Sequence, residues 1–422
     1  MIYLCNQTNS SKTNRKMQLF NRKYLTALLW AVLLPILSTQ AQKTCKYDLG
    51  KPFGWAVCTS LEGGCFNLNG GEGGKSITLK SNGGDMAKTI LKALKENDIV
   101  VLDGSNGPFI IDKTIRVEML KNKTLLGCNG ALLTTRFKMT PEIREKLDEA
   151  NVKALKTSGN GYTLSNGNRV REEAEYHVRQ LLIDYLNDSK EDYRNSGILS
   201  LRGCDNIIVH NIRFEGPGSV DVSGDDLLTA SGTTHLWVDH CAFQDGMDAN
   251  FDINSHADFI TVSWCTFSYS ERSYMHMNTN LVGASDNPNQ GIDNLNVTYA
   301  CCIWGKGCDQ RMPMARWGTI HVLNCLYDCA GNSAAANARK GCEMLVEGCY
   351  FNKGVKNPFR QKDAIAWNLK GNVFIDAFNV EEEGKVAMPY KYTPMEASMV
   401  PEVLQGKGGA GILPALYPLV SF

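Results

Sequence analysis

Three aspartates and two arginines are the residues of this chain whose types and spacing best suit chemistry. Asp248 and Asp252 stand four residues apart, and Asp226 precedes Asp248 by 22 residues. Arg311 and Arg316 flank a proline in the run QRMPMARWG. Carboxylates that converge on one point repel one another unless a cation neutralises them, and ligands that are all oxygen suit calcium. Together with the arginines, the set indicates a calcium-assisted reaction on an acidic substrate.

A repeat in the chain supplies the scaffold that must position these residues. Seven segments carry an aliphatic residue followed five positions later by an aromatic or apolar residue, and the successive anchors are 29, 24, 35, 25, 24 and 23 residues apart. Strand-sized runs at a period in the twenties indicate a solenoid whose coils cover one another. We therefore predict an all-β fold, a single-stranded right-handed parallel β-helix. The pairs are Val209/Phe214, Val238/Phe243, Val262/Phe267, Val297/Cys302, Val322/Tyr327, Val346/Phe351 and Leu369/Phe374.

Two segments depart from the strand pattern. Residues 86–96 have the apolar spacing of a helix, which we expect to cap the N-terminal end of the core. Residues near 140–192 are charged and spaced at 3.6, which predicts a helical insertion, either a surface excursion or the wall of a cleft.

Counting back from the anchor of each coil places the candidate residues on one lateral face. Asp226, Asp248 and Asp252 lie at minus 12, minus 14 and minus 10, and Arg311 and Arg316 at minus 11 and minus 6. Similar offsets in a solenoid mean a shared face. Since 22 residues is about one coil, we expect Asp226 and Asp248 to be neighbours in adjacent coils.

The cysteines follow the same repeat. The third position after the anchor holds Cys241, Cys265, Ala300, Cys325 and Cys349 in five successive coils, with Asn372 in the last. Stacked coils lie about 4.8 Å apart, so we expect an internal ladder of free thiols. Cys45, Cys58, Cys65 and Cys128 lie outside this ladder and could pair, although the sequence does not give their connectivity.

The motifs WVDH (237–240), DANFDI (248–253) and QRMPMARWG (310–318), read in this order, resemble the pectate lyases of the first polysaccharide lyase family. The resemblance covers roughly residues 53–376. It implies calcium-dependent β-elimination of α-1,4-linked polygalacturonate to unsaturated oligogalacturonides. By this resemblance, the residues correspond as follows: Asp226, Asp248 and Asp252 to the calcium ligands, Arg311 to the base and Arg316 to a ligand of the substrate carboxylate.

Two positions qualify the resemblance. Family members often carry a substrate-binding lysine before a Leu-Ile-Gly segment, and here Asn278 holds the matching substrate-binding position before Leu281. Losing that cation puts a preference for fully de-esterified pectate in doubt. We assign no catalysis to the WVDH motif and expect His240 to be a buried, hydrogen-bonded histidine.

Three alternatives stay open. A lyase of methyl-esterified pectin would tend to have replaced the calcium aspartates. A hydrolase on the same fold needs two acidic groups around a water, and Gly224-Asp225-Asp226 has no second motif to complete that set. A non-catalytic glycan-binding β-helix has no need of a base such as Arg311.

The N-terminal segment resembles an export signal. Residues 24–37 are apolar, follow Arg22 and Lys23, and precede small residues up to Ala41. We expect a signal peptide over 1–41, with the true start possible at Met17, and a lyase domain over 42–422. The protein is then exported to the periplasm, the cell surface or the medium.

The charge balance narrows the partners. Lysine plus arginine equals aspartate plus glutamate at 44 each, so a local patch and not a global field must attract an acidic polymer. We expect polygalacturonate or pectin as the partner, no nucleic acid, no stable membrane insertion and a monomer.

Overall fold

The structure is a computed structural model that describes residues 46–47, 49–145, 195–220, 224–414 and 418–419. All of these belong to one compact unit, Lys43–Phe422. The predicted signal peptide lies outside the described residues, and so does most of the predicted insertion at 140–192. Of that insertion, residues 141–145 are helical.

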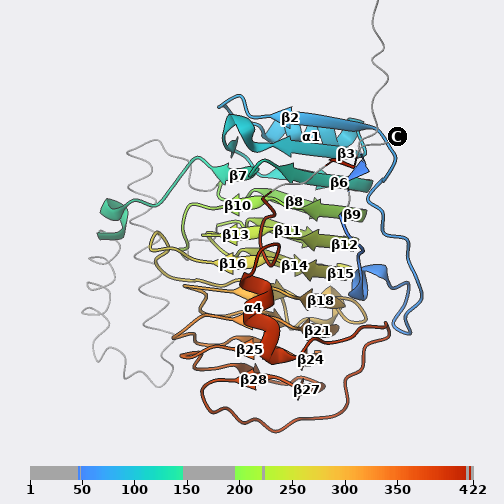
Figure 1. Cartoon of the computed structure of the whole chain (residues 1–422), viewed down its shortest axis with the longest axis vertical. Helices are drawn as coiled ribbons and strands as arrows, with labels where there is room; N and C mark the ends of the chain where they lie inside the picture. The colour runs from blue at the N-terminus through green and yellow to red at the C-terminus, as the bar shows by residue number, and fades with distance from the viewer. Residues whose placement is uncertain (1–45, 48, 146–194, 221–223, 415–417, 420–422) are drawn as a thin grey trace, which may run out of the picture. The chain divides into compact units, whose positions relative to one another are not determined.

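The described chain winds through three parallel sheets, and each sheet takes one strand from each successive coil (Figure 1). This is the predicted parallel β-helix, in the right-handed sense that parallel crossover connections adopt. The ten-stranded sheet contains β2 (Ser76–Lys80), β3 (Ile99–Asp103), β6 (Lys121–Cys128), β9 (Asp205–His210), β12 (Thr234–Asp239), β15 (Asp258–Ser263), β18 (Val297–Ala300), β21 (Thr319–Leu323), β24 (Glu343–Glu347) and β27 (Ala366–Lys370).

The other two sheets complete each coil. The nine-stranded sheet contains β4 (Phe109–Ile111), β7 (Leu132–Thr135), β10 (Arg213–Glu215), β13 (Ala242–Gln244), β16 (Thr266–Ser268), β19 (Ile303–Trp304), β22 (Leu326–Tyr327), β25 (Tyr350–Phe351) and β28 (Val373–Phe374). The eight-stranded sheet contains β5 (Ile115–Glu118), β8 (Leu199–Arg202), β11 (Leu228–Ser231), β14 (Phe251–Asn254), β17 (Leu281–Val282), β20 (Met314–Ala315), β23 (Ala336–Ala338) and β26 (Phe359–Gln361).

The ten-stranded sheet corrects the predicted register of one coil. Val262 of β15 pairs with Tyr299 of β18, and Val297 pairs two residues earlier. The anchor of this coil is therefore Tyr299 and not Val297. The β-branched Val297 also points into the core, which is why its residue type was misleading. Because the register moves by two residues, the ladder position passes from Ala300 to Cys302.

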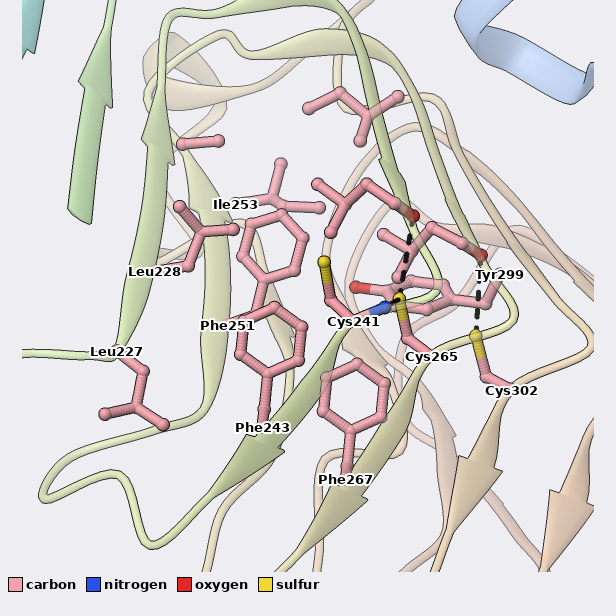
Figure 2. Close-up of a cluster of buried hydrophobic side chains, with 14 of the residues drawn as sticks. Leu227, Leu228, Cys241, Phe243, Phe251, Ile253, Cys265, Phe267, Tyr299 and Cys302 are labelled. Carbon is pink, nitrogen blue, oxygen red and sulfur yellow. Dashed lines mark hydrogen bonds between the residues drawn. The ribbon is translucent and has the colours of Figure 1, made fainter. Parts of the chain in front are cut away.

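The residue five places after each anchor builds a continuous stack of rings in the core (Figure 2). With the corrected register, Trp304 replaces Cys302 as the ring of its coil. Neighbouring ring centroids lie 4.3–5.8 Å apart and the planes are within 21° of parallel. Such offset stacking adds to the burial of large apolar surfaces. The stack comprises Phe214, Phe243, Phe267, Trp304, Tyr327, Phe351 and Phe374.

The cysteine ladder forms as predicted, with Cys302 in place of Ala300, and its thiols are free and buried. The backbone N–H of Cys325 donates to Cys349 Sγ at 3.4 Å, and that of Cys349 donates to Asn372 Oδ1 at 2.8 Å. A left-handed residue precedes each of these positions and turns the chain from the ten-stranded to the nine-stranded sheet. These corner residues are Asn211, His240, Trp264, Cys301, Asn324, Gly348 and Gly371.

Helices and terminal segments cover the solenoid. Helix α1 (Ala87–Glu96) confirms the predicted cap, since Ile90 and Leu94 pack into the N-terminal end of the core. Helix α4 (Val400–Gln405) packs on Leu326, and β1 (Lys46–Tyr47) pairs with β29 (Pro418–Leu419). Short turns of 3-10 helix are η1 (Gly54–Val57), η2 (Gly104–Asn106), η4 (Pro288–Gln290) and η5 (Ala397–Met399).

Within the described part of the chain, none of the helices combines the length and apolar character that crossing a membrane requires.

Replacing Cys325 with alanine tests the packing role of the ladder. Cys325 is fully buried and its sulfur accepts the Cys302 backbone N–H at 3.4 Å. The substitution leaves a small cavity and an unmade hydrogen bond, so we expect a loss of roughly 1–2 kcal/mol in the free energy of unfolding by denaturant. The exposed Cys65→Ala is the matched control and should change it by less than about 0.5 kcal/mol. Equal effects of the two substitutions would contradict a packed ladder.

Candidate active site and metal centre

The eight-stranded sheet brings the three candidate aspartates together. Asp252 lies on β14 and pairs in register with Thr229 of β11, whose hydroxyl donates to Asp226 Oδ2 at 2.9 Å. Asp248 lies just before β14, and the backbone N–H of Leu227 donates to the carbonyl of Ala249 at 3.2 Å. Asp226 and Asp248 therefore occupy neighbouring positions in adjacent coils, as their 22-residue separation predicts.

The carboxyl groups act on one another electrostatically. Burial raises the pKa of Asp226 well above its usual value, and the charges of Asp252 and Asp248 raise it further. Burial raises the pKa of Asp252 to about 7, while the positive charge of Arg311 opposes this rise and Asp248 adds to it. Such shifts mark carboxylates whose shared negative charge is poorly compensated by the protein itself.

This arrangement fits a hard divalent cation such as calcium. Asp226 Oδ1 is buried and has no hydrogen-bond partner among the described residues. A buried carboxylate oxygen without a partner is costly, and a cation would remove that cost. Calcium accepts six to eight oxygens at roughly 2.3–2.6 Å, so three carboxylates leave positions for water and substrate. Asp226, Asp248 and Asp252 are the residues that would hold it.

His276 joins the aspartates, which the sequence motifs did not reveal. Its Nε2 lies 2.8 Å from Asp248 Oδ1. The contact fixes one oxygen of Asp248 and leaves the other for a ligand. A histidine six residues before a short strand carries no distinctive spacing, so only the three-dimensional pairing identifies it.

Arg311 stands beside the aspartates with its guanidinium uncommitted. It lies just before β20, in a left-handed conformation, and its backbone carbonyl accepts the N–H of Asn280 at 2.7 Å. The side chain is partly exposed, and no hydrogen bond or ion pair links its guanidinium to a described residue. Its charge nevertheless reaches Asp252, whose pKa it lowers. The group is therefore placed to meet a substrate.

Arg316, by contrast, is already held. Its Nε donates to Asp286 Oδ1 at 2.6 Å, and its Nη1 donates to the carbonyl of Gly283 at 3.0 Å. The Arg316 guanidinium holds the pKa of Asp286 below its usual value. Because Asp286 is largely exposed, this carboxylate is one that a substrate carboxylate could displace.

The structure does not favour the predicted substrate contact of Asn278. This residue is fully buried, in a bridge between Ala249 and Gln310. Its side-chain amide has no hydrogen-bond partner among the described residues, and its carbonyl accepts the Tyr269 hydroxyl. The alternation of the strand turns the side chain inward, so it does not reach the face that carries the aspartates.

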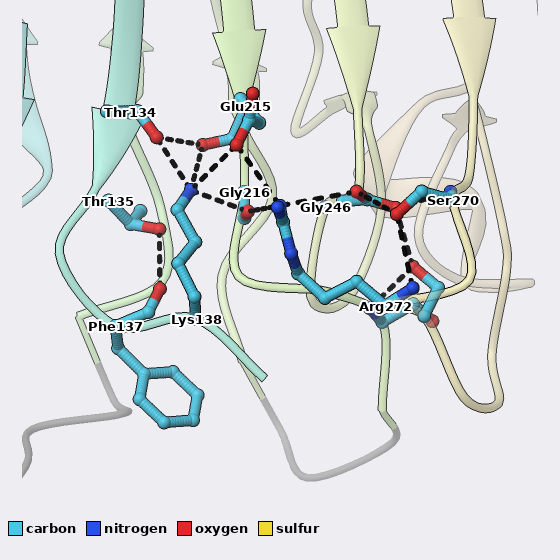
Figure 3. A network of polar contacts seen from close by, with 12 residues as sticks. Thr134, Thr135, Phe137, Lys138, Glu215, Gly216, Gly246, Ser270 and Arg272 are labelled. Atoms are coloured by element: carbon cyan, nitrogen blue, oxygen red, sulfur yellow. Dashed lines mark hydrogen bonds and ion pairs between the residues drawn. The ribbon is translucent and has the colours of Figure 1, made fainter. Parts of the chain in front are cut away.

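A polar network braces the loop that leads to Asp248 (Figure 3). Asp245 is buried and accepts hydrogen bonds from Ser270 Oγ at 2.7 Å and Ser273 Oγ at 2.9 Å. Arg272 bridges Asp245 and Glu215 at 3.4 and 3.1 Å. The network ties consecutive coils together three residues before Asp248, and sequence reasoning missed it because its members lie in loops of different coils.

Comparison with known proteins places the chain among characterised sequences. The profile of a family described as pectate lyase matches residues 188–411. Over 138 residues the chain is 38% identical to a pectate trisaccharide-lyase of Thermotoga sp. (strain RQ2), an alignment covering 31% of this chain and 36% of that protein. Over 214 residues it is 32% identical to pectate lyase A of Aspergillus niger, covering 49% and 62% of the two chains. The chain thus aligns with less than two thirds of the length of either relative.

Solved structures share the fold. A pectate lyase of Bacillus sp. N165, crystallised with trigalacturonate, superposes with a TM-score of 0.56 at 18% identity, over 86% of this chain and 99% of that one. A Bacillus subtilis pectate lyase variant gives a TM-score of 0.56 at 17% identity, over 88% and 99%. At these identities the likeness shows the fold.

The aspartate cluster predicts a pH-dependent stability that calcium reverses. The pKa of Asp252, about 7 in the folded protein, exceeds its value of about 3.9 in an unfolded chain. A carboxyl group with a raised pKa favours the folded state while it is protonated, and this contribution disappears as the pH rises through about 7. Calcium-free protein should therefore melt at a lower temperature at about pH 8 than at about pH 5, and calcium should raise the melting temperature more at the higher pH.

The matched variant is Asp252→Asn, which removes the titrating charge and keeps the shape. Its melting temperature without calcium should depend less on pH than that of the wild type. A wild-type protein whose response to calcium is the same at both pH values would contradict the convergence of the three carboxylates.

Proposed function

The chain belongs to the pectate lyase family, and we propose that it cleaves α-1,4-linked polygalacturonate by calcium-dependent β-elimination, giving unsaturated oligogalacturonides. The observation that carries this proposal is the convergence of Asp226, Asp248 and Asp252, with raised pKa values for two of them, beside the uncommitted guanidinium of Arg311. A carbohydrate-binding surface alone would need neither the cluster of buried like charges nor a free base beside it.

The reaction breaks the C5–H and C4–O bonds of a galacturonate and forms a double bond between C4 and C5. Calcium held by the three aspartates would bind the substrate carboxylate and stabilise the negative charge that develops next to it. The proton leaves C5 with a base, its electron pair forms the double bond, and the glycosidic oxygen departs and takes a proton from solvent. The aspartates position the sugar, and the protein need not form a covalent intermediate.

Arg311 is the residue we assign as the base. Arginine accepts a proton only from its neutral form, which is scarce in water. A cation close to the guanidinium disfavours the charged form, and so the same aspartates that hold calcium would favour the base. If Arg311 instead stays charged, it still stabilises the developing anion, and the substitution below separates these roles from a structural one.

Arg316 is the residue we assign to a second substrate carboxylate. Its ion pair with the exposed Asp286 keeps the guanidinium oriented before substrate arrives. Exchanging one carboxylate for another keeps the charge balance, so binding costs little reorganisation. His276 holds Asp248 in place and need not contact the sugar.

We further propose that the protein is exported and acts as a monomer. The apolar run at 24–37 with its preceding basic residues supports export. A polymer too large to enter a cell is degraded where it is found, which agrees with a protein that leaves the cytoplasm.

Incubation with polygalacturonate, with and without a chelator, tests the proposal directly. We expect ultraviolet absorbance from unsaturated ends, and its loss with the chelator. New reducing ends without that absorbance would mean hydrolysis. Faster absorbance on highly methyl-esterified pectin would favour the pectin lyase alternative, and binding without any product would favour a glycan-binding β-helix.

Arg311→Lys should remove most turnover, on the order of a hundredfold or more, and leave folding and calcium binding nearly intact. Lysine keeps the charge but loses the planar fork that can address both C5 and a carboxylate. Because the Arg311 side chain makes no ion pair or hydrogen bond to the described residues, the fold does not depend on it. Circular dichroism and turnover are measured together with Arg360→Lys, an exposed arginine on β26, as the control. Unchanged turnover in folded protein rules Arg311 out as the base.

Asp248→Ala or Asp252→Ala should raise the calcium concentration for half-maximal activity by at least tenfold, and excess calcium should partly restore turnover. Each substitution removes one oxygen ligand and one negative charge. The exposed Asp293→Asn is the control and should leave the calcium requirement unchanged. Variants that unfold and never recover activity with calcium would show that these aspartates only stabilise their turns.

A further inference from the structure

A second cluster of metal-binding side chains lies on the outer face of the ten-stranded sheet, away from the sheet that carries the aspartates. His210 ends β9 and pairs in register with Asp239, which ends β12, and His240 follows at the corner. The sheet register therefore fixes one histidine and one carboxylate in adjacent coils, and the left-handed corner residue adds the second histidine. The WVDH motif contributes two of the three.

The donor atoms of these residues converge. Asp239 Oδ2 lies 3.0 Å from His210 Nδ1 and 2.5 Å from His240 Nδ1, and one donor atom from each residue lies within 4.8 Å of the others. Two ligands of a tetrahedral zinc ion, each bound at roughly 2.0–2.1 Å, stand about 3.3 Å apart. The three side chains therefore need to move outward only slightly to accept an ion between them.

His210 is the independent sign of a missing ligand. It is 1% exposed, and neither ring nitrogen has a hydrogen bond of acceptable geometry to a described residue. Its Nδ1 is near Asp239 but poorly aligned with it. Buried polar groups in folded proteins are nearly always satisfied, so an imidazole in this state suggests a partner that is not part of the polypeptide.

The surroundings prepare Asp239 and His240 as ligands. Burial would raise the pKa of Asp239, but hydrogen bonds from His210 and His240 hold it below its usual value, so the group is ionised. Its other oxygen accepts the Ser263 hydroxyl at 2.5 Å, and Trp237 donates to that hydroxyl at 2.8 Å. His240 stacks on Trp264 with planes 5° apart. Oriented ligands of this kind are typical of metal sites.

We propose that His210, Asp239 and His240 bind one borderline divalent cation, of which Zn²⁺ is the representative, at a site separate from the aspartate cluster. Two imidazoles and a carboxylate suit zinc and disfavour calcium, which prefers oxygen ligands. The His240 side chain is 16% exposed, so the fourth position opens toward solvent and accepts a water. The ion ties the ends of β9 and β12 together.

Titration of the purified chain, without a histidine tag and after chelator treatment, tests the site. Zn²⁺ is added in saturating calcium and followed by calorimetry and by the melting temperature, and Co²⁺ serves as the coloured substitute. We expect one ion per chain, a higher melting temperature and the visible spectrum of four-coordinate Co²⁺. His240→Ala should weaken binding at least tenfold, since even an outer partner of a metal ligand costs that much.

Two variants locate the ion. The exposed His256→Ala and the aspartate variant Asp252→Asn should both bind Zn²⁺ as the wild type does. If Asp252→Asn removes the binding, the ion occupies the aspartate cluster and the proposal is wrong.

The proposal is equally wrong if the wild type binds no Zn²⁺, or if His240→Ala binds it as well as the wild type. Because His240 lies at the rim of the cluster, its substitution should leave the fold intact even if a variant of the buried His210 does not fold. No readout depends on lyase activity, so this proposal stands or fails apart from the proposed reaction.

Discussion

The backbone hydrogen bonds between successive coils are the constraint on which the rest of this structure depends. Parallel strands hold equivalent residues about 4.8 Å apart, so every side chain is set against the same position of the next coil. The ladder that joins β9, β12 and β15 in one register also stacks rings, thiols and corner residues. A side chain is thus placed as much by the neighbouring coils as by its own.

The same ladder concentrates like charges. Pairing Thr229 with Asp252 brings Asp226, Asp248 and Asp252 to one face, where burial raises the pKa of two of them. A fold that aligned residues less strictly would let these carboxylates separate into solvent. Here they cannot separate without breaking the sheet, and binding a cation is the remaining way to relieve the repulsion. Arg311 completes the face without being consumed by an internal ion pair.

The repeat made the fold and the aspartate face predictable, because period and residue type survive in the sequence. The capping helix over Ala87–Glu96 and the thiol ladder followed from the same pattern. The coil containing Val297 and Tyr299 was placed two residues out of register, since both residues are buried and apolar. Only the pairing with its neighbours distinguishes them.

Contacts between loops of different coils lay beyond the reach of the sequence. His276 reaches Asp248, and Arg272 bridges Asp245 and Glu215, yet none of these pairs has a fixed spacing along the chain. Asn278 shows the converse. It matched a motif position by counting, but the alternation of its strand turns the side chain into the core. Spacing predicted the coil of each residue and not the direction of its side chain.

The central claim, that this face eliminates and does not hydrolyse, is tested most directly by weighing the products. A defined oligogalacturonate is digested in heavy-oxygen water with calcium, and the fragments are analysed by mass spectrometry. The account predicts fragments whose masses sum to that of the substrate, with no heavy oxygen incorporated and no fragments when calcium is chelated. Fragments that together exceed the substrate by the mass of one labelled water, or that form equally well without calcium, would contradict it.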